Sequence, residues 1–308
     1  MNELKRDDRG QAMVMTVLFT MALLGMAALV LDVGSWFRAH RNLQATADAA
    51  ALAGAQALPD DPGQAGSLAS QYADKNQPAL TGMTVDFVNG ISANDTIKVR
   101  VTKPAPGFFS KLFGVDTVTE HATATARTGG MAKALYVAPI VVNKLHPMLA
   151  GAGCPCFGPT NGTTIPVGTT GAPGAFGLVN LAGGSNGTSG ASELADWIMN
   201  GFDKYLDIGS YFSDPGVKFN SNQIQDAMKA RLGTELLFPV YDTLTGQGSN
   251  AAYHVIGWVG FHVESMTAQG TGGSITGYFT QVIWTGIQAS TAGGGGPNFG
   301  ARTVQLID

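Results

Sequence analysis

The sequence RGQAMVMTVLFTMALLGMAALVLDVGSWFRAHRNLQATADAAALAGAQAL, residues 9–58, organises the rest of the chain. Its first part, Gln11 to Leu31, is a run of about 21 residues without a formal charge, long enough as a helix to span the ~30 Å hydrocarbon core of a bilayer. Helix is the expected state because a lone spanning segment must satisfy its own backbone hydrogen bonds. Trp36 and Phe37 follow where aromatic side chains favour the membrane interface, and two arginines lie just beyond. The pattern predicts a transmembrane helix over residues 11–33.

The helix is expected to continue beyond the membrane as a stalk over residues 34–58. Asn42 to Leu58 contains no proline and a single glycine, and it is rich in alanine, the best helix former. Pro59 ends the helix. Small residues at four-residue spacing either let a second helix come close or serve only as helix filler. They form two neighbouring stripes, Ala47, Ala51 and Ala55 on one and Ala50 and Gly54 on the other.

The stretch resembles the N-terminal module of the TadE/TadG-like group, which are Tad-type (Flp) pilus-assembly proteins. Two polar signatures flank the apolar span in order, and the resemblance covers the first sixty residues well. It implies a short cytoplasmic tail over residues 1–10, a bulk outside the cytoplasmic membrane, and no catalytic residues to carry over. The matching residues are Arg9, Gly10, Gln11, Asp32, Val33, Gly34, Arg41, Leu43, Gln44, Ala47, Asp48, Ala49, Ala50, Ala51, Leu52, Ala53, Gly54 and Ala55.

Two acidic residues in this stretch are candidate functional groups. Asp32 lies near the expected bilayer edge, where an unpaired carboxylate is costly, so it either has a functional role or reaches headgroup water. Asp48 is expected on a polar face of the stalk, beside Gln44 one turn earlier. Neither residue is assigned a catalytic role.

N-terminal processing offers alternatives to an intact anchor. The apolar run is longer than the 7–15 residues of a signal-peptide core, and the small-residue cleavage candidates near Ala53 and Ala57 lie far beyond the basic residues. The resemblance also implies a prepilin-like cut after Gly10, but Met15 stands where prepilins of this system usually carry a glutamate. The sequence favours an anchor over a signal peptide and leaves the second cut open.

The composition suits a surface protein better than a cytosolic enzyme. Only 13% of the 308 residues are charged and 42 are glycine, and this length allows two extramembrane domains. The net charge of -4, without a basic cluster outside the membrane flanks, gives no reason to expect a nucleic-acid partner. Basic residues are more numerous before the apolar run than after it, which favours a cytoplasmic N-terminus.

Residues 59–128 are expected to form a small α/β unit. Ile97, Val99 and Val101 alternate with polar residues, which is typical of a strand with one buried face. A long N-terminal helix packed on a small antiparallel sheet would be pilin-like in architecture. The expected elements are a helix over Ala65 to Gln77 with Leu68, Ala69 and Tyr72 on one side, strands over Thr84 to Val88, Thr96 to Thr102 and Thr117 to Arg127, a turn at Asn94-Asp95 and a helical turn over Phe108 to Phe113.

Gly129-Gly130 is the expected boundary to a β-rich α+β domain over residues 131–308, with an antiparallel sheet or a partly closed barrel. Segments within it, such as FPVYD and YHVIGWVGF, also look like the region that follows the module in some longer members of the group. Its expected strands are Leu135 to Val142, Phe176 to Leu181, Leu236 to Tyr241, Ala252 to Glu264, Ser274 to Thr285 and Ala301 to Ile307. Helices are expected from a Ser192 cap to Phe202 and from an Asn220 or Ser221 cap to Arg231, and loops over Asn143 to Gly174, Gly183 to Gly190 and Gly293 to Gly296.

Two groups outside the anchor are candidate sites. Cys154 and Cys156 are a possible disulfide, but residues two apart lie ~7 Å apart in extended chain, so bonding requires a tight turn. His262 and Glu264 share a strand face with His254, which lies ~26 Å away on a straight strand, so a metal site competes with a solvated face opposite Tyr253, Val255, Val259, Phe261 and Val263. No catalytic or cofactor-binding motif is present, and no cofactor or metal is expected.

The sequence thus predicts a non-enzymatic, single-pass component of the cytoplasmic membrane, an accessory or minor pilin-like part of Tad-type pilus assembly and adhesion. The bilayer and other pilus or secretion proteins are the expected partners, the latter through helix–helix packing of the alanine-rich stalk. One alternative is a membrane-anchored surface binding module unrelated to pili, with Trp258, Tyr278 and Trp284 exposed to a ligand. A less favoured alternative is a metal-dependent envelope enzyme using His262 and Glu264.

Overall fold

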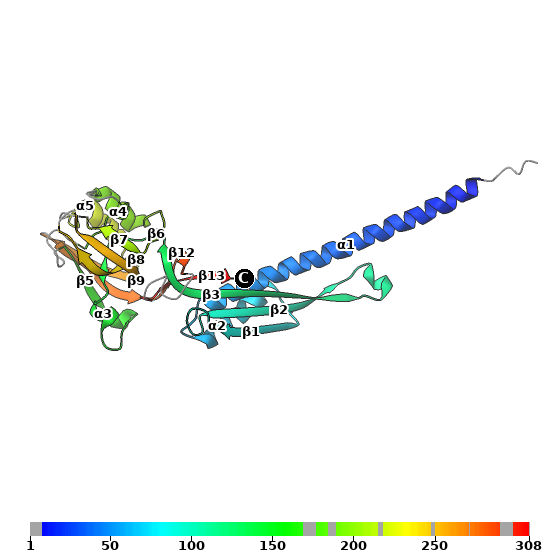
Figure 1. The fold of residues 1–308 in the computed structure, drawn as a ribbon, viewed down its shortest axis with the longest axis horizontal. Helices are drawn as coiled ribbons and strands as arrows, with labels where there is room; N and C mark the ends of the chain where they lie inside the picture. Colours follow the sequence, from blue (N-terminus) through cyan, green and yellow to red (C-terminus); the bar gives the residue numbers. More distant parts are fainter. Residues whose placement is uncertain are drawn as a thin grey trace, which may run out of the picture. The chain divides into compact units, whose positions relative to one another are not determined.

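The computed structural model describes residues 8–168, 177–183, 189–214, 218–247, 250–270, 272–289 and 298–307. The chain has a mixed α+β fold, as the sequence predicts, with a long N-terminal helix followed by β-rich structure (Figure 1). It divides into two compact units. The first comprises Met1–Val88, Thr96–Arg127 and Leu306–Asp308, and the second comprises Asn89–Asp95 and Thr128–Gln305.

Helix α1, Asp8–Ala55, runs without interruption for 48 residues. The continuous helix predicted from the sequence is confirmed, and the chain turns over residues 56–60, where Pro59 prevents a further helical turn. Residues 11–31 are exposed, apart from a half-buried Ala28, whereas many side chains from Asp32 onward are buried. The same helix is therefore bare over its apolar part and packed over its alanine-rich part.

The packed part of α1 lies against three antiparallel strands and a second helix. The strands are β1 at Gly82–Val88, β2 at Thr96–Pro106 and β3 at Thr117–Ala134, and they are consecutive neighbours in a seven-stranded sheet. The predicted alternation is confirmed, because Ile97, Val99 and Val101 are fully buried. A short 3₁₀ helix, η1 at Ser110–Phe113, forms the tip of the β2–β3 hairpin.

Helix α2, Pro62–Asn76, covers the same core. Asp61 caps it by accepting a hydrogen bond of 2.8 Å from the N–H of Gln64. The buried face consists of Ala65, Ala69 and Ala73, and of the larger residues expected on that side Leu68 is half-buried and Tyr72 is exposed. Two alanine-lined helices can approach closely, and larger side chains are left at the edge of the contact.

The second unit is built on a sheet of order β4-β8-β9-β10-β5, with β7 also paired to β9. Its neighbours are antiparallel except for β4 and β8. Phe261 lies in the core, with ring centroids 5.4 Å from Phe238 and 5.2 Å from Phe279. The strands are β4 at Val142–Asn143, β5 at Thr163–Val167, β7 at Gly209–Phe212, β8 at Glu235–Thr245, β9 at Ala252–Gln269 and β10 at Gly272–Thr280.

Shorter strands and helices complete this unit. Strands β6 at Leu206–Asp207 and β12 at Gly286–Gln288 pair with the end of β3, and β11 at Val282–Ile283 runs parallel to β13 at Ala301–Ile307. The helices are α3 at Pro147–Ala150, η2 at Pro159–Asn161, α4 at Ala191–Asn200 and α5 at Asn222–Ala230. Ser221 caps α5, as expected, but Gly190 rather than Ser192 precedes α4.

Two sequence predictions for this unit are wrong in secondary structure. Leu135 to Val142 is mostly buried but is not a continuous strand, because Tyr136 adopts a φ of 57° and Pro139 lacks an amide donor. The segment expected to be loop after Asn143 contains β5, whose Pro166 is tolerated because β5 is the edge strand of its sheet.

Other boundaries can be stated briefly. The two units divide at Arg127 and Thr128, and Gly129-Gly130 continues β3. The expected loop at Gly293 to Gly296, the centre of the expected turn at Gly183 to Gly190, and Phe176 lie outside the described residues.

Candidate functional site

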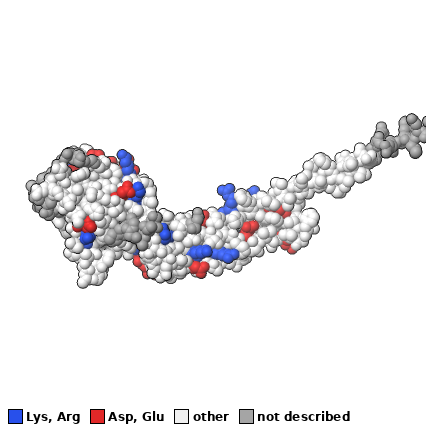
Figure 2. All heavy atoms as spheres, in the orientation of Figure 1, with Lys and Arg blue, Asp and Glu red and all other residues white. Residues whose placement is uncertain are grey.

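The apolar part of α1 is the first component of the site. Within the described residues, one helix is long and apolar enough to cross a membrane, with a mean hydropathy of 2.4 over its most apolar 18 residues, none of which is buried. Where its residues are not grey, the projecting part of this helix carries no acidic or basic colour in Figure 2. A core helix of a soluble domain would bury such a surface, so the bare helix is compatible with a single passage through a bilayer.

Asp32 lies where this apolar surface ends, and it binds the tip of the β2–β3 hairpin. Its side chain is 2% exposed. Its Oδ1 accepts hydrogen bonds from the backbone N–H groups of Phe108 and Phe109, at 2.9 Å and 3.2 Å. Its Oδ2 accepts from Phe109 at 3.0 Å and from Ser110 at 2.5 Å. The carboxylate is therefore satisfied within the protein, so the alternative that it reaches headgroup water is not what the structure shows.

Three further side chains extend this contact along α1 at four-residue intervals. Trp36 Nε1 donates to the carbonyl of Pro106 at 3.3 Å, and His40 Nδ1 lies 3.1 Å from Glu120 Oε2. Gln44 Nε2 donates both to the carbonyl of Thr123 at 3.0 Å and to Asp48 Oδ1 at 2.8 Å. We call Asp32, Trp36, His40 and Gln44 the polar stripe. Because residues four apart lie on one helix face, the stripe fastens the hairpin along three turns of α1.

The small residues of the stalk follow the polar stripe further along α1 and are buried inside the first unit. Ala47 and Ala51 are fully buried, as is most of the alanine run to Ala55. A Cβ placed on Gly54 would lie 2.5 Å from Ile97 Cδ1 and 2.9 Å from the carbonyl oxygen of Ala65. The expectation that this stripe packs against helices of other proteins is therefore wrong, because the chain's own β2 and α2 already cover it.

The remaining residues of the family pattern differ in how closely they are packed. Arg9, Gly10 and Gln11 lie in the first turns of α1, and Gln11 is exposed. A Cβ placed on Gly34 would have no neighbouring atom within 4 Å, and Arg41 Cζ lies 5.9 Å from the ring centroid of Phe37. Leu43 is 2% exposed and joins the buried face.

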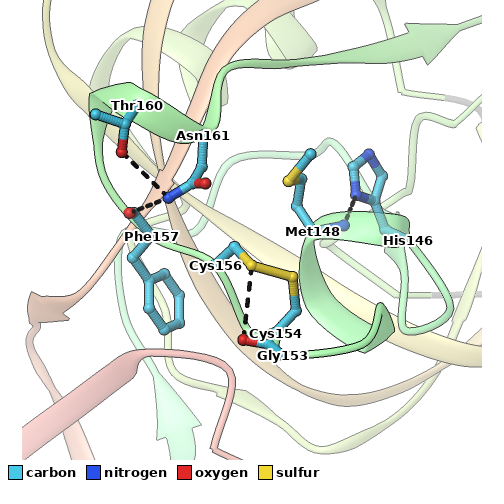
Figure 3. Close-up of a disulfide and its surroundings, with 8 residues drawn as sticks. All are labelled: His146, Met148, Gly153, Cys154, Cys156, Phe157, Thr160 and Asn161. Carbon is cyan, nitrogen blue, oxygen red and sulfur yellow. Dashed lines mark hydrogen bonds between the residues drawn. A yellow bond between two sulfur atoms is a disulfide. The ribbon is translucent and has the colours of Figure 1, made fainter.

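Cys154 and Cys156 form a disulfide in the loop that follows α3 (Figure 3). Their Cα atoms are 4.5 Å apart, so the chain makes the tight turn that bonding requires. Nearby, His146 Nδ1 accepts a hydrogen bond of 3.2 Å from the N–H of Met148, and burial lowers the pKa of that histidine. The surroundings are structural contacts, and the described residues contain no group of three or more potential metal ligands.

The histidines of β9 are engaged by carboxylates. His262 Nδ1 lies 3.0 Å from Glu235 Oε1 and stacks on Tyr278, while Glu264 is exposed. His254 Nδ1 lies 2.9 Å from Asp242 Oδ1, on a separate pair. The structure therefore does not bring His254, His262 and Glu264 together. The opposite face of the strand is buried, as predicted, at Tyr253, Val255, Val259, Phe261 and Val263.

The aromatic residues considered for ligand binding do not form an exposed surface. Trp258 is 2% exposed and belongs to the core. Trp284 is half-buried, and its Nε1 donates to the carbonyl of Leu135 at 2.8 Å. Tyr278 is half-buried against His262. The expectation of an exposed aromatic ligand surface is wrong for Trp258.

Most of the polar stripe was not predicted from the sequence, although a signal was present. Asp32, Trp36, His40 and Gln44 recur at every fourth position immediately after the apolar run. Side chains at that spacing share a helix face, and the small residues of the stalk continue this face toward Ala55. Only the pair of Gln44 and Asp48 was predicted, and the structure confirms their proximity.

The geometry defines a class of protein with one long N-terminal helix. The apolar end of this helix is exposed, and its other end packs against antiparallel strands. Comparison with known families gives the same stretch a more specific relationship. Residues 10–57 match the family model described as putative Flp pilus-assembly TadE/G-like, which confirms the resemblance over that part of the chain. No curated protein and no solved structure matches the chain.

Proposed function

We propose that this chain is a non-catalytic, membrane-anchored accessory or minor pilin-like component of Tad-type (Flp) pilus assembly and adhesion. The main support for the proposal is that the family match and the long helix cover nearly the same residues. The family match covers residues 10–57, and helix α1 covers Asp8–Ala55. The part of the chain that matches a pilus-assembly family is therefore helix α1 itself. Its apolar part is exposed, as a membrane span would be, and its alanine-rich part is packed in the core of the first unit.

We further propose that residues 1–10 lie in the cytoplasm and that the residues after α1 are extracytoplasmic. The excess of basic residues before the apolar run supports this orientation. The disulfide between Cys154 and Cys156 also supports it, because such bonds persist outside the reducing cytoplasm.

The proposed partners are the bilayer and other proteins of the pilus apparatus. The buried small-residue face cannot supply the protein contacts, so they are assigned to the apolar segment of α1 within the membrane and to the exposed surfaces of the two units. A non-catalytic role accords with a match to an assembly family, and with histidines that are occupied by carboxylates.

The test is deletion of the gene in its native host, followed by counting of surface Flp pili and measurement of surface attachment. We expect both to fall and to be restored by the wild-type chain. Complementation with Gly54→Leu, which disrupts the packing of α1 against β2 and α2, should fail. Complementation with Ala45→Leu, at an exposed position of the same helix, should succeed. Unchanged pilus number and attachment in the deletion strain would contradict the proposal.

A further inference from the structure

The tip of the β2–β3 hairpin exposes a concentration of large apolar side chains. Leu112 is 82% exposed, Phe113 is 84% exposed and Phe108 is 63% exposed, with Phe109 and Val115 beside them. Scattered apolar residues are ordinary on a protein surface, but a contiguous group of this kind marks an interaction site. Strand β2 and the part of β3 up to Arg127 lie in the first unit, and the hairpin tip lies beside α1 (Figure 1).

The tip and α1 enclose an apolar groove. It has a volume of about 690 Å³ and is lined on one side by α1 from Leu24 to Trp36 and on the other by Phe109, Leu112 and Phe113. At ~1.5 Å per residue, Leu24 lies ~10 Å deeper along the helix than Leu31, where the uncharged run ends. The groove is thus continuous with the surface of α1 that the bilayer is proposed to cover, and it extends to the depth typical of interfacial insertion.

Most backbone N–H groups of the tip have hydrogen-bond acceptors within the protein. A loop entering lipid must satisfy its N–H groups within the protein, because lipid offers no hydrogen-bond acceptor in place of water. Four N–H groups are bonded within the hairpin, those of Leu112, Gly114 and Val115 on the tip and that of Gly107 just before it. Three more, those of Phe108, Phe109 and Ser110, are bonded to Asp32.

The charges of the region fit the same placement. Asp32 is a carboxylate that a bilayer edge would penalise, and the three amides of the tip remove that penalty. Lys111 on the tip and Asp116 just after it are exposed, and the long lysine side chain can reach the headgroup region while its stem lies along apolar surface. The Asp32 carboxylate and the N–H groups of the tip are therefore hydrogen-bonded to each other at the point where α1 would leave the hydrocarbon core of the bilayer.

We propose that the hairpin tip, residues 108–115, is a second membrane-contacting element, which inserts into the same leaflet as the end of the α1 span, with lipid acyl chains filling the groove between them. The insertion fixes the first unit against the bilayer surface at two points instead of one. This inference rests on the proposed membrane anchorage of α1, and the following experiment separates the two.

The experiment uses the full chain in vesicles of phosphatidylethanolamine and phosphatidylglycerol at a ratio of about 3:1, with a nitroxide label on one introduced thiol at a time. Leu112→Cys and Phe113→Cys report on the tip, Leu24→Cys on the anchor, and Gln71→Cys on an exposed position of α2. Because the native cysteines are joined in a disulfide, only the introduced thiol reacts. Collision with oxygen, which concentrates in lipid, is compared with collision with a water-soluble nickel chelate.

The proposal predicts that labels at 112 and 113 have high oxygen-to-nickel collision ratios, shifted from the ratio at 71 toward that at 24. A ratio at 112 and 113 equal to that at 71, with label 24 in lipid, overturns the insertion and leaves the anchor intact. Labels at 24, 112 and 113 that all report water overturn the anchor as well. Labels at 112 and 113 that neither reagent reaches indicate coverage by protein, which also overturns the assignment to lipid.

Discussion

The backbone N–H of Ser110 donates a hydrogen bond of 2.5 Å to Asp32 Oδ2, across 78 residues of sequence. It is the shortest of the bonds that hold the hairpin tip on α1. Because hydrogen bonds to ionised groups are stronger than neutral ones, this carboxylate sets the position of the tip. Helix and tip are thereby joined at the level where the apolar run of α1 ends.

Replacement of Asp32 should release the tip without unfolding the sheet. In Asp32→Ala, the N–H groups of Phe108, Phe109 and Ser110 lose their acceptor and exchange with solvent faster, by an order of magnitude or more since each bond to a charged group is lost. Hydrogen–deuterium exchange of the peptide spanning the tip measures this change. Asp48→Ala, which removes a carboxylate of the stalk, is the matched control, and equal exchange in the two variants would contradict the role of Asp32.

Gly54 should be intolerant of any side chain. In Gly54→Ala the new Cβ would lie 2.5 Å from Ile97 Cδ1 and 3.2 Å from Ala69 Cβ, so the first unit is expected to lose about 1–3 kcal/mol of unfolding free energy. Exchange of the α2 amides in vesicle-bound protein measures that loss.

Gly34→Ala is the control for this substitution. It places the same methyl group on the same helix where nothing lies within 4 Å. It is expected to be neutral or to stabilise the helix by up to about 1 kcal/mol. A loss of similar size in both variants would show that packing around Gly54 does not decide the result.

The disulfide predicts how the cysteines react in cells. When intact cells are treated with an alkylating agent before lysis, Cys154 and Cys156 should remain unmodified, because both thiols are oxidised. Both should be modified once a reductant is added. Mass spectrometry of the peptide that contains them measures the result, and full modification without reductant would place this loop in a reducing compartment.

The pair of Asp242 and His254 predicts an acid dependence of the second unit. The hydrogen bond from His254 lowers the pKa of Asp242, with a smaller contribution from the charge of Lys144. A lowered folded pKa means that the unfolded state binds more protons near pH 4, so this stabilisation is present above about pH 4 and is lost as the pH falls through the folded value.

Urea unfolding of the second unit, followed by near-ultraviolet circular dichroism at a series of pH values, tests this dependence. The stability difference between the wild type and Asp242→Asn should be largest above about pH 5 and should shrink toward pH 2. Asp226→Asn, at an exposed carboxylate 3.6 Å from Lys229, is the control and should show little change with pH. A difference for Asp242→Asn that stays constant across the range would rule out the proposed linkage.

The sequence predicted the features that depend on local composition and period. The helix from Gln11 into the stalk, the alternating strand at Ile97 to Val101 and the Ser221 cap follow from hydrophobic runs, side-chain alternation and capping chemistry. The correct assignments are those in which neighbouring residues alone determine the outcome.

The sequence predictions that failed concern contacts between residues that are far apart in the chain and backbone conformations that composition does not reveal. The small residues of the stalk predict a close helix contact, but only the three-dimensional structure shows that α2 and β2 of the same chain supply it. Leu135 to Val142 has strand composition, but the left-handed conformation at Tyr136 interrupts any ladder. The partners of Asp32 lie 76 to 78 residues away, and no local pattern specifies so distant a pairing.

Sedimentation of membranes after an alkaline carbonate wash tests the central claim most directly, because the wash removes proteins that only adhere to the bilayer. The full-length chain should remain in the membrane pellet and be released by detergent alone, as expected for α1 crossing the hydrocarbon core. Recovery of the full-length chain in the soluble fraction, without detergent, would contradict membrane anchorage and the role in pilus assembly that depends on it.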